Sequence, residues 1–299
     1  MRPVALVAAG LALAGCTPVE MRRVSVPPAQ ALRAEPPQLR GMQYLYGSGE
    51  GAAISRQTWN AVIDHVASRL AGKDRSGVVL ADDATLAAPR FVSCAGKPPA
   101  AVFDVDETVL LNLGAEADDL ARGANSFDEA RWDRFEKTGG ASTVAAPGAA
   151  EALARLRAMG LTVIFNSNRK AANAAESRAA IEAAGLGPAV HGETLFLSGD
   201  DATGSRKDMR RARIAARFCV MALGGDQLGD FSDLFRSVGS VTARRVATGS
   251  PPVDRLWGRG WFVLPNPVYG PALAGGIDDI FPADKRWRDP ADSNRKEPN

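Results

Sequence analysis

Two carboxylates one residue apart follow a short apolar run. Asp104 and Asp106 come directly after residues 100–103, which read Ala-Ala-Val-Phe and predict a β-strand. Because alternate side chains of a strand share a face, the two carboxylates would project together where the strand ends. Such a pair can hold a divalent cation while one member acts as nucleophile and the other as acid or base. An isolated Asp-x-Asp is more often a turn or a solvated strand end, so its interpretation depends on the motifs downstream of it.

Four further polar groups that could take part in chemistry come later in the chain. Ser167 comes after a second apolar, β-branched run, and its hydroxyl can donate to an anion. Lys207 lies in a basic cluster and can neutralise charge that builds up on a phosphoryl group; a solvated helix face is the alternative interpretation of that cluster. Asp226 and Asp230 follow a third apolar run and two glycines, and they add oxygen ligands suited to a hard cation.

The elements that must position these groups alternate between apolar strand-like runs and Ala-rich helices, such as residues 149–159 and 171–184. This alternation predicts an α/β fold with a mostly parallel sheet. Ligands of such sheets bind beyond the carboxyl ends of the strands, where Asp104, Ser167 and Asp226 would converge. An earlier amphipathic helix is indicated by apolar residues at helical spacing: Trp59, Ile63, Val66 and Leu70.

Acid pair, hydroxyl, lysine and acid pair, in this order, resemble the haloacid dehalogenase superfamily of phosphohydrolases. Residues 104–112 and 225–231 resemble the paired signatures of the class C acid phosphatases, a bacterial lipid-anchored outer-membrane group, and residues 146–149 and 265–270 are also similar to that family. The resemblance covers residues 41–287 and implies a Rossmann-like, mostly parallel sheet flanked by helices. It also implies a small, mainly helical cap at residues 114–143. Two positions depart from the family pattern, with Gln227 where Asn or Thr is usual and Ala115 where an aromatic is usual.

The resemblance implies a role for each motif. Asp104 would be the nucleophile and Asp106 the acid and base that first protonates the departing alkoxide and then activates water. Ser167 and Lys207 would bind the transferring oxygens. Mg²⁺ is the implied cofactor, held by or close to four acidic residues: Asp104, the backbone carbonyl of Asp106, Asp226 and Asp230. An acid at position 106 disfavours haloacid dehalogenation, in which there is no alkoxide to protonate.

The family suggests small phosphomonoesters as substrates, in particular nucleoside monophosphates or nicotinamide mononucleotide, as for a 5′-nucleotidase. Asn168 and Arg169 are the candidates for shaping the pocket. Trp132, in the cap, and Tyr269 are candidates for stacking on a nucleobase or nicotinamide ring, and packing in the core is the alternative for each. The resemblance leaves open a homodimer.

The N-terminus predicts export. Arg2 precedes an apolar stretch that is too short for a membrane-spanning helix and reads as a signal peptide over residues 1–15. Leu-Ala-Gly-Cys at its end resembles a bacterial lipobox, which implies lipidation of Cys16 and, by family analogy, anchoring in the outer membrane of the cell envelope. An ordinary secretory peptide with a chance cysteine is the alternative. Residues 16–40 read as an extended tether, residues 41–288 as the phosphatase domain and residues 289–299 as a disordered tail.

Cys94 and Cys219 are the cysteines that remain after Cys16. Each comes shortly before, or at the start of, a strand that ends in a catalytic acid, and the family's sheet makes these two strands neighbours. An exported protein meets oxidising conditions. A Cys94–Cys219 disulfide and two separate buried thiols therefore both remain open, and a count of free thiols on the denatured, unreduced protein distinguishes them.

Composition excludes several classes of function. The 299 residues carry a formal net charge of only +2, so no nucleic-acid-binding field is implied, and the basic run at residues 206–213 lacks the interleaved aromatics of a base-stacking surface. A transporting ATPase is excluded by the missing membrane spans. The remaining alternative to a phosphatase is a lipid-anchored binding or adhesion protein that keeps the fold without the chemistry. The presence of all six motif residues speaks against it.

Overall fold

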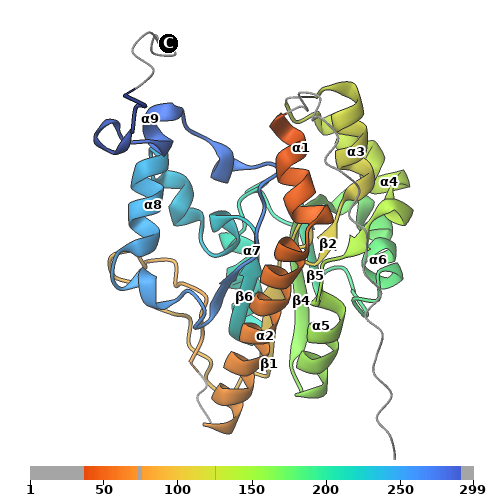
Figure 1. The fold of residues 1–299 in the computed structure, drawn as a ribbon. Coiled ribbons are helices and arrows are strands. Elements are labelled where there is room, and N and C mark those ends of the chain that lie inside the picture. The colour runs from red at the N-terminus through yellow and green to blue at the C-terminus, as the bar shows by residue number, and fades with distance from the viewer. Residues whose placement is uncertain (1–36, 73–75, 125, 291–299) are drawn as a thin grey trace, which may run out of the picture. The chain divides into compact units, whose positions relative to one another are not determined.

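Five strands form a parallel sheet on which the other elements pack (Figure 1). The computed structural model describes residues 37–72, 76–124 and 126–290. Neighbouring strands are parallel throughout the order β5-β4-β1-β6-β7. Their bounds are β1 (Pro99–Phe103), β4 (Thr162–Lys170), β5 (Leu195–Ser198), β6 (Cys219–Gly225) and β7 (Trp261–Val263). The α/β fold and the mostly parallel sheet predicted from the sequence are confirmed.

Both faces of the sheet are buried under helices because apolar side chains point to either side of each strand. In β1, Ala101 and Phe103 join a core with α2, α5 and α6, whereas Ala100 and Val102 join a second core with α7. The helix bounds are α2 (Gly49–Ala71), α5 (Ala149–Ala158), α6 (Ala174–Ala183) and α7 (Asp208–Arg217). Trp59 of α2 is almost fully buried and packs against Phe103 with ring centroids 5.1 Å apart and the rings tilted by 54°. The central strand is therefore fixed from both sides just before Asp104.

An insertion between two short strands forms the predicted cap region. Strands β2 (Leu110–Leu111) and β3 (Val144–Ala145) pair antiparallel. Between them lie α3 (Leu113–Arg122), α4 (Glu129–Thr138) and the 3₁₀-helix η2 (Gly140–Ser142). The insertion is thus helical, and that these residues, 114–143, cap the site stays a prediction.

A helical arm precedes α2. It consists of α1 (Pro37–Met42) and the π-helix η1 (Gln43–Gly47), and Ser48 caps the following helix by accepting a hydrogen bond from the Gly51 backbone N–H at 2.9 Å. Helical structure therefore begins inside the span 16–40 predicted to be a tether. Proline is well tolerated in the first turn of a helix, so Pro37 does not prevent this earlier start.

The remaining helices follow β6. They are η4 (Leu228–Asp230), η5 (Asp233–Ser237), α8 (Val241–Gly249), η6 (Val253–Arg255), η7 (Pro271–Leu273), α9 (Ile277–Ile280) and η8 (Ala283–Lys285). One further 3₁₀-helix, η3 (Ala171–Asn173), comes earlier, directly before α6. None of the helices in the described ranges is long and apolar enough to cross a bilayer. The predicted signal peptide and Cys16 lie outside the described residues, as do residues 291–299 of the predicted tail.

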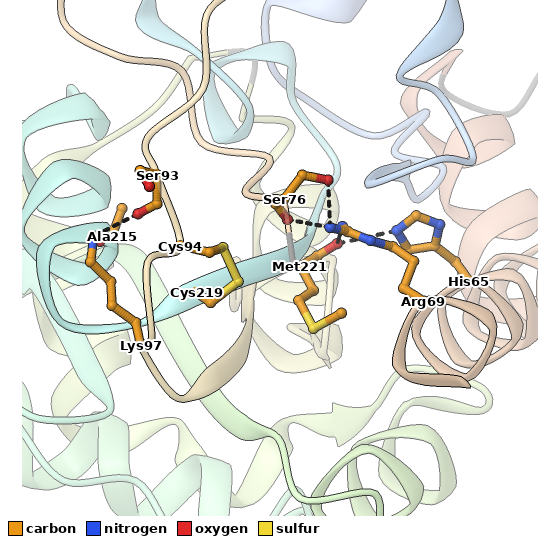
Figure 2. Close-up of a disulfide and its surroundings, with 9 residues drawn as sticks. All are labelled: His65, Arg69, Ser76, Ser93, Cys94, Lys97, Ala215, Cys219 and Met221. Atoms are coloured by element: carbon orange, nitrogen blue, oxygen red, sulfur yellow. Dashed lines mark hydrogen bonds between the residues drawn. A yellow bond between two sulfur atoms is a disulfide. The ribbon is translucent and has the colours of Figure 1, made fainter. Parts of the chain in front are cut away.

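A disulfide joins Cys94 to Cys219 at the start of β6 (Figure 2). Of the two possibilities that the sequence left open, the structure therefore has the bonded pair. Two residues further along β6, the register with β1 shifts and leaves Met221 without a partner in that strand. The Met221 carbonyl instead lies 3.2 Å from His65 Nε2 and accepts from Arg69 Nη1 at 3.1 Å. The strand that leads to Asp226 is thus tied both to the Cys94 loop and to α2.

Candidate active site

The six residues predicted for catalysis and metal binding lie at or just beyond the carboxyl edge of the sheet. They are four acids, one hydroxyl and one lysine. They come from the ends of three adjacent strands and from the two segments that follow β5 and β6. Asp104 and Asp106 follow β1, Ser167 lies near the end of β4, Lys207 directly precedes α7, Asp226 follows β6, and Asp230 ends η4. Parallel strands expose the same end at one edge, so the alternation read from the sequence is sufficient to bring these residues together.

Lys207 lies between two of the carboxylates. Its Nζ is 2.5 Å from Asp104 Oδ1 and 2.7 Å from Asp230 Oδ1, and the lysine is only 2% exposed. Burial lowers its pKa, but the two carboxylates outweigh that effect and raise the pKa of Lys207 above its ordinary value. Lys207 therefore stays charged and offers a fixed cation beside the predicted nucleophile.

Three carboxylates gather around this point. Oxygens of Asp104, Asp226 and Asp230 all lie within 4.8 Å of one another. Burial raises the pKa of Asp104 well above its usual range, with Lys207 opposing and Asp230 adding to the shift. Burial and the neighbouring Asp230 likewise raise the pKa of Asp226 to about 7. Three buried oxygen donors that repel one another fit a hard divalent cation, which relieves that repulsion.

Hydrogen bonds orient the last two acids. Asp226 accepts from Thr108 Oγ1 at 3.2 Å, and from Gln227 Nε2 and Asn266 Nδ2 at 2.8 Å each. Asp230 accepts from the backbone N–H of Gln227 at 2.9 Å. The departure at Gln227 from the family pattern therefore still leaves a side chain that donates to Asp226.

Glycine is required at position 225, in the turn that brings Asp230 close to the end of β6. A Cβ added at Gly225 would lie 2.3 Å from the Cβ of Asp230. Only a residue without a side chain lets Asp230 pack back over the end of β6, so the close approach explains this glycine.

The two oxygens of Asp106 have different surroundings. Oδ1 accepts three hydrogen bonds, from Arg169 Nε at 2.9 Å, Arg169 Nη2 at 2.7 Å and Asn112 Nδ2 at 3.0 Å. Oδ2 has one long contact, 3.4 Å from the Ser167 hydroxyl. Oδ1 is therefore occupied by the protein, and Oδ2 is the oxygen that remains for a substrate or water.

The comparisons with known proteins agree with this geometry. Residues 51–272 match the HAD superfamily, subfamily IIIB (acid phosphatase). The chain belongs to this acid phosphatase family. No curated protein sequence matches it significantly.

Among solved structures, this acid phosphatase is similar in fold and sequence to one particular class. It is similar to the class C acid phosphatase from Bacillus anthracis, with 24% identity and a TM-score of 0.63, over 79% of this chain and 86% of that one. The same enzyme with tungstate bound gives 25% identity and again a TM-score of 0.63, over the same shares of both chains. The class C resemblance seen in the motifs is confirmed, and the protein is a phosphomonoesterase.

Arg169 and Asn168, predicted to shape the pocket of this phosphatase, have different positions. Arg169 is 1% exposed and ion-pairs with Asp106, so its guanidinium serves the acid rather than an open pocket. Asn168 is exposed, and its Oδ1 accepts from Arg210 Nη2 at 2.8 Å. Since Arg210 holds the amide oxygen, the amide nitrogen of Asn168 is the end left for a ligand.

The cap of the phosphatase is attached beside Ser167. Glu136 of α4 accepts from the Lys170 backbone N–H at 3.1 Å and from Asn173 Nδ2 at 2.7 Å, directly after the end of β4. Trp132, on the same helix, is half-buried between aromatic rings, with its centroid 5.2 Å from that of Phe135 and 6.3 Å from that of Phe127. Its described contacts are thus those of packing within the cap.

Tyr269 contacts an acid to which the sequence had assigned no role. Its hydroxyl donates to Glu107 Oε2, so the polar end of the ring is already engaged, and the side chain is half-buried. Glu107 and Asn112 were overlooked because neither attacks phosphorus nor needs to bind a cation. The available signal was their position inside the segment that resembles the family signature. Asn266 was missed for the same reason.

Proposed function

We propose that this acid phosphatase is a Mg²⁺-dependent phosphomonoesterase that acts through an aspartyl-phosphate on Asp104. The observation that carries the proposal is the pairing of a largely buried carboxylate with a buried lysine, Asp104 with Lys207, beside a second acid whose Oδ2 has only one long contact, with Ser167. A nucleophile, a charge-stabilising cation and a proton donor are what hydrolysis in two steps requires.

Asp104 acts as the nucleophile in the first step. Its carboxylate oxygen bonds to phosphorus as the bond between phosphorus and the substrate oxygen breaks. Lys207 and the Ser167 hydroxyl bind the phosphoryl oxygens and balance the charge that they gain in the transition state.

Asp106 moves the protons. Oδ2 gives its proton to the departing alkoxide. In the second step it takes a proton from the water that attacks phosphorus, which breaks the bond between phosphorus and Asp104 and releases phosphate. Arg169 and Asn112 hold Oδ1, so the carboxylate cannot rotate away from this task.

Asp104, Asp226 and Asp230 would hold the magnesium ion, and the carbonyl of Asp106 stays a predicted further ligand. When bound, the ion supplies positive charge that reduces the repulsion between the carboxylate of the nucleophile and the anionic substrate. The preference for oxygen donors is what distinguishes Mg²⁺ from softer metals here.

Nucleoside monophosphates and nicotinamide mononucleotide are the substrates that we propose, with Asn168 donating from its amide and Trp132 or Tyr269 contacting the base. The similar Bacillus anthracis enzyme has been solved with tungstate bound, which supports oxyanion binding by this fold. We also propose that the mature chain is a lipoprotein of the outer membrane, anchored through Cys16. The homodimer stays a prediction.

The decisive experiment is phosphate release from AMP, nicotinamide mononucleotide and p-nitrophenyl phosphate by the full-length protein, with MgCl₂ or with EDTA. We expect release with Mg²⁺, little with EDTA, and none by Asp104→Asn in either buffer. Equal release in both buffers would remove the metal from the proposal. Turnover of Asp104→Asn at the wild-type rate would remove the nucleophile. The order of kcat/KM among the three compounds ranks the substrates.

A further inference from the structure

We infer that Tyr46, on the helical arm formed by residues 37–47, is a positioning residue of the active site that acts through Glu107 and Asn112 on Asp106. The inference rests on the proposed acid and base role of Asp106. It adds a catalytic contribution from a segment that lies before the family match, which begins at residue 51.

Glu107 is the centre of the network. Among the described residues, it is the one residue other than glycine with a positive φ, 52°, and it is 1% exposed. Such a backbone is strained for a residue with a side chain and persists only where its surroundings enforce it. Here the carboxylate of Glu107 is buried and hydrogen-bonded within the protein. A strained, buried acid next to the predicted proton donor calls for a functional explanation.

Four hydrogen bonds saturate the Glu107 carboxylate. Oε1 accepts from the Tyr46 hydroxyl at 3.1 Å and from the Asn112 backbone N–H at 2.9 Å. Oε2 accepts from the Tyr269 hydroxyl and from Asn112 Nδ2, the latter at 3.0 Å. The donors come from three separate segments: the arm, the start of α3, and the loop of residues 265–270. Glu107 therefore holds these segments in one arrangement.

Asn112 links Glu107 to Asp106 by hydrogen bonds. Its Nδ2 lies 3.0 Å from Glu107 Oε2 and 3.0 Å from Asp106 Oδ1, while its Oδ1 accepts from Arg169 Nη2 at 2.9 Å. An amide that is held at both ends cannot rotate without breaking a buried bond. Asp106 Oδ1 thus has a fixed donor, and Oδ2 keeps a fixed direction toward the substrate.

The arm that carries Tyr46 is packed closely against the rest of the site. A Cβ added to Gly41 would lie 2.0 Å from the carbonyl oxygen of Pro267, so the backbones of α1 and the loop that bears Tyr269 are in direct contact. Tyr46 itself packs against the core cluster of α2 and β1. Burial, with the nearby Glu107, raises the pKa of Tyr46, so its hydroxyl stays protonated and donates. The π-helical turn η1 sets this side chain, as such turns often do at functional sites.

Two substrates with different leaving groups distinguish a residue that positions the acid from one that only supports the fold. Breaking the ester bond of AMP leaves an alkoxide, which needs the proton from Asp106, whereas p-nitrophenolate is stable enough to leave without one. The parameter kcat/KM reports the steps up to and including this bond cleavage. A loss confined to the alkyl ester therefore indicates a misplaced acid.

The test is Tyr46→Phe, which removes one hydroxyl and keeps the ring. With saturating Mg²⁺, we expect kcat/KM for AMP to fall on the order of tenfold, as for one weakened hydrogen bond to a charged group, and that for p-nitrophenyl phosphate to fall less than about twofold. Tyr44→Phe is the matched control, because it removes a hydroxyl from the same π-helix at a side chain that is 37% exposed. Both of its kcat/KM values should equal those of the wild type.

Asp106→Asn provides a second, independent check. Tyr46→Phe added to Asp106→Asn should cause no further loss with AMP, since the residue on which Tyr46 acts is already disabled. An equal loss on both substrates, a full further loss in the double variant, or no loss in Tyr46→Phe would each overturn the inference. If the wild type itself releases no phosphate with Mg²⁺, the proposed function fails, whatever Tyr46 does.

Discussion

Lys207 is a single residue on which both stability and the proposed chemistry depend. Its ammonium group is the cation that the structure places between Asp104 and Asp230. A buried ion pair that loses one partner leaves an uncompensated charge, which costs about 3–5 kcal/mol. A bound divalent cation would supply the missing positive charge to the same carboxylates.

We therefore expect Lys207→Met to lose stability in a metal-dependent way. The free energy of unfolding should fall by about 3–5 kcal/mol in EDTA and by clearly less in saturating MgCl₂, while kcat falls in MgCl₂ because the phosphoryl oxygens lose their partner. Urea denaturation in the two buffers measures the difference. Lys97→Met is the control, since Lys97 Nζ donates only to the carbonyls of Ser93 and Ala215 among its described contacts. The same loss in both buffers would show that Lys207 and the cation do not share their carboxylates.

Roles at the residue scale were predictable where the chemistry needs a particular side chain. Asp104, Asp106 and Lys207 could be found because acid pair, hydroxyl and lysine occur in the order that resembles the family, and the structure brings these residues together. Tyr46 could not, because its contact with Glu107 spans 61 positions and depends on how the arm packs. Tyr269 illustrates the opposite case, since an aromatic residue predicts stacking, whereas its hydroxyl donates to Glu107, an acid to which the sequence analysis gave no role.

Among the elements, β6 is the strand whose position matters most to the site. It begins at the disulfide, its Met221 carbonyl is held by α2, and it ends at the turn that leads to Asp226. A cross-link between residues 125 positions apart removes many conformations from the unfolded chain. Its main effect should therefore be on stability rather than on the chemistry at the far end of the strand.

Replacing Cys94 and Cys219 together by alanine should lower the free energy of unfolding by about 2–4 kcal/mol, with kcat/KM at low temperature changed less than about twofold. Thermal denaturation and steady-state kinetics on the same samples test both parts. Treatment of the wild type with a reductant should lower its Tm to about that of the double variant. The same treatment should leave the Tm of the double variant unchanged. A large loss of kcat/KM in the folded variant would show instead that the cross-link shapes the site.

The elements were predicted unevenly for a physical reason. Central strands β1, β4 and β6 are buried on both faces, so each gives an apolar run that the sequence reveals. The edge strands β5 and β7 have 4 and 3 residues, too few to show a pattern. The cap was located by resemblance, since its charged helices have no apolar run to mark them.

At the scale of the whole molecule, the buried acids make the stability of the metal-free protein depend on pH. Burial raises the pKa of Asp226, Glu107 and Glu116 to about 7 each in the folded protein, well above the values for the unfolded chain. The folded state therefore binds more protons than the unfolded state between about pH 4.5 and 7. Stability from these groups is complete below that window and is lost as the pH rises through it.

In EDTA, we expect Tm to fall between pH 5 and pH 8, and added MgCl₂ to raise Tm more at pH 8 than at pH 5, because the cation binds deprotonated carboxylates. Thermal denaturation at several pH values with and without MgCl₂ gives both slopes. Asp226→Asn should flatten the slope in EDTA. A Tm in EDTA that stays constant, or rises, over this range would contradict the burial of these acids in the metal-free state.

The helical arm also affects where the molecule can be divided. The region that defines the family begins after Tyr46 and after the Gly41 contact with Pro267, so a fragment cut at that border would keep the sheet, every motif residue and the disulfide. It would nevertheless lack one of the four donors that hold Glu107. Such a fragment should fold, bind Mg²⁺ and cleave activated aryl esters, yet give a misleadingly poor rate on nucleotides. An assay of that fragment would thus understate activity on nucleotides, the substrates that we propose.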